Sequence, residues 1–119
     1  MIVSMFDLLT NPPAFLVQIA ARYEARKIAF AEWTGILDRE LHTHMGMLVF
    51  VVIILVFRLP LRSPWPWIAA VIVELNNEFL DRVNYGSWRW PDTKIDLLFT
   101  LMWPTLLFVC ARTGLLTKR

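Results

Sequence analysis

The chain has 119 residues, a formal net charge of +2 and a hydrophobic content of 57%, well above that of soluble domains. A soluble chain of this length could not bury so much apolar surface, so the composition predicts a single-domain membrane protein. Basic residues are scattered among acids, which argues against a nucleic-acid-binding surface. The single cysteine, Cys110, lies in an apolar run and cannot form an intrachain disulfide.

The first 40 residues are predicted to lie outside the bilayer core. A short apolar lead ends at Asn11-Pro12-Pro13, where proline suits the first turn of a helix. Apolar residues then recur every three to four positions, at Ile19, Tyr23, Phe30, Trp33, Leu37 and Leu41. Charged residues fill most other faces, so we expect an amphipathic helix on the membrane surface or against a partner, with Gly35 able to break it.

Residues 41–119 are predicted to form three transmembrane helices, at about 41–59, 65–83 and 93–111. The first is free of charge from Met45 to Phe57, and tryptophans at the start of the second suit the membrane interface. Pro104 is expected to kink the third. Because the connections are short, the predicted fold is an all-α antiparallel bundle with an N-terminal interfacial helix.

Alternation of the three spans brings their polar ends to one side of the membrane. Ten residues there are candidates for one polar cluster: His42, His44, Glu74, Asn77, Glu78, Asp81, Arg82, Asp92, Asp96 and Thr100. Four of them, from Glu74 to Asp81, share one helix face. Carboxylates at membrane depth are costly unless they face a bundle interior or a cavity, so we predict a buried site within one leaflet.

The order of these motifs resembles the VanZ-like family of small bacterial membrane proteins. The matching elements are Asp38 to His42, Glu74 with Asn77, Arg82, and Asp96 with Thr100. The chain departs at Arg39, Asn77, Thr100 and Pro104, where the family commonly has Lys, Gln, Asn and Gly, and it has the amphipathic helix where the family usually has another span. The resemblance implies a multi-pass protein of the bacterial cytoplasmic membrane, and an architecture more than a reaction. The Lys and Arg distribution weakly favours a cytoplasmic C-terminus.

Several roles for the cluster stay open. The polar groups can bond the helices together. Paired carboxylates with Arg82 and Arg89 can form a ligand or catalytic pocket for a polar or lipid-linked phosphate headgroup.

A metal site is a weaker interpretation, because the possible ligands lack a dedicated spacing. The residues concerned are His42, His44, Glu78, Asp81 and Asp92. His44 as an axial pigment or haem ligand is weaker still. The sequence requires no cofactor.

The remaining alternative is an accessory subunit of a larger respiratory or photosynthetic membrane complex. The long amphipathic helix, six tryptophans and short loops suit a protein that docks on partners. We predict binding or assembly rather than catalysis, with a protein partner or self-association.

Overall fold

A computed structural model describes residues 5–86 and 89–116, and the regular secondary structure of these residues is all α-helical. The helices are α1 (Met5–Thr10), α2 (Ala14–Thr34), α3 (Asp38–Phe57), α4 (Trp65–Tyr85) and α5 (Trp90–Arg112). Among the described residues, two helices are long and apolar enough to cross a membrane: α3 from Arg39 to Phe57, and α5. The predicted span at 65–83 corresponds to α4, whose second half carries four charged residues.

Proline and glycine set most of the helix boundaries. Pro66 and Pro91 lie in the first turns of α4 and α5, where a missing backbone N–H costs no hydrogen bond. Gly35 and Gly86 end α2 and α4 in the left-handed conformation, at φ 72° and 75°. Gly35 therefore breaks the N-terminal helix, as its place in the sequence indicated, and Leu37 lies beyond the end of α2.

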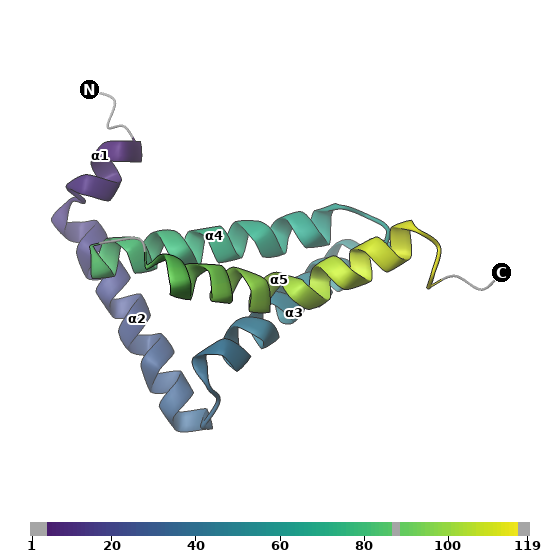
Figure 1. Cartoon of the computed structure of the whole chain (residues 1–119), viewed down its shortest axis with the longest axis horizontal. Coiled ribbons are helices and arrows are strands. Elements are labelled where there is room, and N and C mark those ends of the chain that lie inside the picture. The colour runs from purple at the N-terminus through teal and green to yellow at the C-terminus, as the bar shows by residue number, and fades with distance from the viewer. Residues whose placement is uncertain (1–4, 87–88, 117–119) are drawn as a thin grey trace.

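Helices α3, α4 and α5 lie side by side and run in alternating directions, while α2 crosses one end of this group and packs on α4 (Figure 1). The molecule measures 55 × 41 × 28 Å. Helix α5 continues through the buried Pro104 and changes direction about midway along its length (Figure 1). The crossing of α2 places its side chains over the polar end of α4.

The contact between α3 and α5 is close enough to exclude a side chain. A Cβ atom added at Gly46 would overlap the backbone carbonyl oxygen of Thr100 and lie 2.9 Å from the Cγ2 atom of that residue. Small residues at helix crossings let two backbones approach in this way. Gly46 lies one turn after His42, so this contact also fixes the position of the histidine relative to α5.

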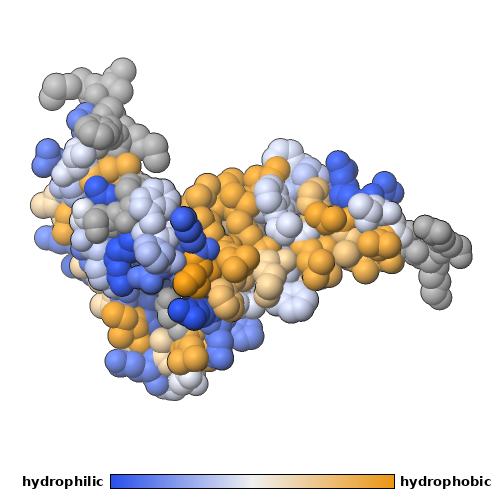
Figure 2. All heavy atoms as spheres, in the orientation of Figure 1, coloured by the Kyte–Doolittle hydropathy of each residue, from blue (hydrophilic) through white to orange (hydrophobic). Residues whose placement is uncertain are grey.

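The surface of the molecule changes in polarity along its long axis. Figure 2 shows apolar atoms over the middle of the helical group and hydrophilic atoms over the end where α2 crosses. Exposed apolar side chains on α3 and α5 include Leu55, Val56, Leu98 and Leu106, each about half to two-thirds exposed. Few large apolar residues are fully buried in return, Phe50 being one. An apolar exterior around a polar interior suits a lipid solvent.

Candidate functional site

A buried polar group joins α3, α4 and α5 next to the Gly46 contact. The hydroxyl of Thr100 donates a hydrogen bond to Glu74 Oε2 at 2.9 Å. His42 Nδ1 lies 3.3 Å from the same Glu74 oxygen and 3.2 Å from Thr100 Oγ1, and its Nε2 lies 3.5 Å from Asp96 Oδ2. Each of the four residues is at most 8% exposed. A protonated His42 would therefore place its charge between two carboxylates.

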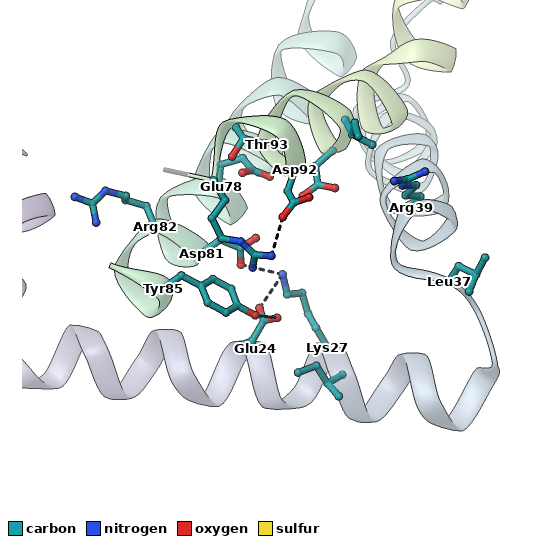
Figure 3. A pocket seen from close by; sticks show the side chains of 14 residues that line it. Glu24, Lys27, Leu37, Arg39, Glu78, Asp81, Arg82, Tyr85, Asp92 and Thr93 are labelled. Carbon is teal, nitrogen blue, oxygen red and sulfur yellow. Dashed lines mark hydrogen bonds and ion pairs between the residues drawn. The ribbon is translucent and has the colours of Figure 1, made fainter. Parts of the chain in front are cut away.

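A second polar group forms where α2 crosses α4, and its centre is the ammonium of Lys27. Lys27 Nζ lies 3.1 Å from Glu24 Oε2 and 3.0 Å from Asp81 Oδ1, and it donates to Asn77 Oδ1 at 3.2 Å. The hydroxyl of Tyr23 donates to the same Asn77 oxygen at 2.8 Å. Figure 3 shows the Lys27 side chain directed from α2 towards the carboxylates. The polar face of α2 is therefore docked on α4.

Ion pairing dominates the electrostatics of this second group. Burial disfavours the charged form of Lys27, but the carboxylates of Asp81 and Glu24 outweigh it and raise the pKa of the ammonium above its ordinary 10.5. Burial also acts to raise the pKa of Glu24, but the hydrogen bond and charge of Lys27 lower it below the ordinary 4.5. Lys27 and Glu24 are thus both charged at neutral pH.

A cavity of about 610 Å³ lies between α2, the start of α3, the end of α4 and the start of α5 (Figure 3). Its charged lining residues are Glu24, Lys27, Arg39, Glu78, Asp81, Arg82, Arg89, Asp92 and Asp96. Arg89 pairs with Asp92 at 2.7 Å on the exposed side. The guanidinium of Arg82 points away from Lys27 in Figure 3. The inner wall therefore carries buried acids, while Arg39 and Arg89 lie on the exposed side and Arg82 is partly buried.

The structure divides the ten candidate residues predicted from the sequence into three sets. Seven belong to the two polar groups or, in the case of Glu78, are buried on the cavity wall beside them: His42, Glu74, Asn77, Glu78, Asp81, Asp96 and Thr100. Arg82 and Asp92 lie on the cavity wall. His44 is exposed, since its place two residues after His42 turns it to another face of α3. Of the weak metal candidates, Glu78 groups with Asp81 and Asp96, and neither His42 nor Asp92 belongs to that trio.

Residues from α2 were the main omission of the sequence analysis. Tyr23, Glu24 and Lys27 were assigned to a helix separate from the cluster, whereas they provide a cation and two further polar side chains in contact with it or with each other. Their spacing places Glu24 and Lys27 on the same helix face as the fully buried Ala20. That shared face was the sequence signal that could have placed Glu24 and Lys27 against α4. Thr93, which is 6% exposed on the cavity wall, was also missed.

Four residues on which the sequence resemblance was based come together in space although they lie on separate helices. His42, Glu74, Asp96 and Thr100 form the first polar group, whereas Arg82 lies further along α4. The chain matches no protein-family model, and neither a curated protein nor a solved structure is significantly similar to it.

Proposed function

We propose that this protein is an integral membrane protein that binds a cationic ligand in the acidic cavity at one membrane face. One observation carries the proposal: Glu74, Glu78 and Asp96 are each less than 10% exposed inside a helical group whose exterior is apolar. Buried carboxylates in such a setting need partners or water. A cation bound in the cavity would balance the negative charge of these acids.

In the proposed membrane arrangement, α3, α4 and α5 are three antiparallel spans and α2 is an interfacial helix. The apolar band in Figure 2 supports this arrangement, as do the exposed Ile19, Phe30 and Trp33 of α2. We place the protein in the bacterial cytoplasmic membrane, with the C-terminus in the cytoplasm and the cavity on the other face.

Labelling of single cysteines tests the arrangement in a variant in which Cys110 is replaced by Ala. A membrane-impermeant maleimide should label Arg89→Cys at the cavity from one side only. It should not label Leu106→Cys or Val52→Cys, which lie in the apolar band. Labelling of the band positions at the rate of Arg89→Cys would refute membrane insertion.

The balance of charged residues in the cavity lining supports a cationic ligand over an anionic one. The lining contains five acids and four bases. Lys27 already pairs with Asp81 and Glu24, and Arg89 with Asp92. The inner wall thus carries the carboxylates of Glu78 and Asp96, and His42 approaches the second of these at 3.5 Å.

The function is tested on the full chain in lipid nanodiscs, with thermal unfolding followed by tryptophan fluorescence. Spermidine serves as an organic cation, and Ca²⁺, Mg²⁺ and Mn²⁺ as metal cations. Binding of at least one class should raise the unfolding temperature. Glu78→Gln and Asp96→Asn should abolish the increase, while Glu32→Gln on the exposed part of α2 should keep it. If no cation stabilises the protein, or if all variants respond equally, the proposal fails.

A zwitterionic lipid headgroup is a second candidate, because Arg39, Arg82 and Arg89 lie on the same cavity wall as the acids. An amine could reach the carboxylates while the phosphate meets an arginine. Native mass spectrometry should then show retained phosphatidylethanolamine in preference to phosphatidylglycerol. Equal retention of the two lipids would exclude this candidate.

Membership of a VanZ-like family and a role as an accessory subunit stay proposals. The convergence of His42, Glu74, Asp96 and Thr100 supports the first, and the exposed aromatic residues of α2 support the second. The same mass spectra test the second, since a stoichiometric protein partner from native membranes would assign α2 to an interface. A chain free of such a partner would leave the bilayer surface as the site for α2.

A further inference from the structure

Three carboxylates on two helices converge at the inner wall of the cavity. Glu78 and Asp81 lie one turn apart on α4, and Asp96 faces them from α5. One oxygen from each lies within 4.8 Å of the others. We propose that these three side chains bind a hard divalent cation, of which Ca²⁺ fits best. This inference rests on the proposed function and names its ligand.

The separation of the oxygens suits one shared cation, and the difference in coordination between Ca²⁺ and Mg²⁺ favours Ca²⁺. Ca²⁺ binds oxygen at about 2.3–2.6 Å, so two ligands on opposite sides of the ion are about 4.6–5.2 Å apart. Mg²⁺ binds at about 2.0–2.1 Å and needs a smaller, octahedral arrangement. Oxygens within 4.8 Å of one another can share one cation, and the flexible geometry of Ca²⁺ demands less of their arrangement than the octahedron of Mg²⁺. A trio of carboxylates without thiolate or imidazole also selects hard cations.

A buried oxygen of Glu78 gives a second, separate indication of a ligand. Glu78 is 4% exposed, and its Oε1 atom has no hydrogen-bond partner among the described residues. Burying a carboxylate oxygen in this way is costly. Because Glu78 lines the cavity, a cation bound there would satisfy the atom.

Two basic side chains already contact the trio. Lys27 Nζ lies 3.0 Å from Asp81 Oδ1. His42 approaches Asp96 through Oδ2 at 3.5 Å. The nearby ammonium should weaken the affinity by repulsion, so we expect a dissociation constant on the order of 10⁻⁴ M, at the weak end for Ca²⁺ sites.

The cavity has room for the remaining ligands of the ion. Ca²⁺ takes six to eight oxygens, and carboxylates can supply one or two each. The 610 Å³ volume can hold water as well as an ion, and Thr93 places a hydroxyl on the same wall.

Equilibrium dialysis with radioactive Ca²⁺ on the full chain in nanodiscs tests the site, with Mn²⁺ electron paramagnetic resonance as a second readout. We expect one ion per chain. Glu78→Gln should weaken binding by at least about 10-fold, because it keeps the shape of the side chain and removes its charge. Asp96→Asn should act similarly, and it keeps the test decisive if Glu78→Gln does not fold. Asp92→Asn, which removes an exposed acid of the same cavity, should change the affinity by less than about 2-fold.

Two results would overturn the site. One is binding of less than about a tenth of an ion per chain at millimolar Ca²⁺. The other is an equal loss of Ca²⁺ affinity in the Asp92→Asn and Glu78→Gln variants. If no metal ion binds while spermidine still stabilises the protein through Glu78 and Asp96, the proposed function is retained and the divalent-cation site is refuted. If neither class binds, both fail.

Discussion

Replacement of Gly46 by alanine should destabilise the protein, although alanine is the better helix former. In an ordinary helix interior this change stabilises by about 0.5–1 kcal/mol. Here the added Cβ would overlap the Thr100 carbonyl oxygen and lie 2.9 Å from the carbonyl carbon. These are backbone atoms, which cannot rotate away. Helix α3 must therefore move away from α5.

The net effect follows from two opposing contributions. Overpacking of a well-packed contact costs about 1–3 kcal/mol. After subtraction of the gain in helix propensity, Gly46→Ala should lower the free energy of unfolding by about 1–2 kcal/mol. Gly46→Val should cost more. The displacement should also lengthen the contacts of Thr100 with His42 and Glu74, which are now 3.2 and 2.9 Å.

Thermal unfolding in one detergent, followed by tryptophan fluorescence, measures the effect. Leu48→Ala is the control, since this side chain is 55% exposed on the same helix and should have a smaller effect. A Gly46→Ala protein as stable as the wild type, or more stable, would show that the two backbones are not in contact.

The other predictions concern the contact between α2 and α4. Lys27→Met should weaken this contact by about 1–3 kcal/mol, because it leaves two partly buried carboxylates without their cation. Hydrogen exchange of α2 should rise, and Lys27→Arg should raise it less; equal exchange in all three proteins would contradict the role of the charge. Tyr23→Phe should cost about 0.5–1.5 kcal/mol through the lost bond to Asn77, measured by the same exchange, and no change would mean that water replaces the hydroxyl. Because the pKa of Lys27 is raised above 10.5, its contribution is fully present below pH 10.5 and is lost as the pH rises through the raised pKa. Spin-label distances between α2 and α4 should stay constant from about pH 7 to 10 and increase above 10.5, whereas an increase already near pH 8 would assign the contact to another group.

The helices were largely predictable because their signals are local. Prolines in the first turns of α4 and α5, and glycines after α2 and α4, mark boundaries through backbone geometry alone. The end of α3 was also placed within two residues, since Arg58 follows a long apolar run. Periodicity correctly indicated that Glu74 and Glu78 share a buried face.

Contacts between distant segments were harder to predict. The Gly46–Thr100 contact depends on how two helices cross, and a single glycine in an apolar run does not show this. The docking of α2 was missed for a related reason, because Lys27 has the same local pattern whether its helix face meets water or carboxylates. The prediction of a single polar cluster therefore included His44, which is exposed. It omitted Lys27, which forms ion pairs with Glu24 and Asp81.

The position of Asp96 and Thr100 on the last helix has a consequence for biosynthesis in the proposed membrane arrangement. The chain is made from its N-terminus, so Glu74 and Glu78 leave the ribosome before the partners that α5 provides. During this interval, the polar partners described for α4 come from the helices made earlier, and they include His42, Tyr23 and Lys27. The polar half of α4 is poorly suited to enter lipid alone. Helices α4 and α5 should therefore enter the membrane together as a hairpin, with α4 retained only once α5 has joined it.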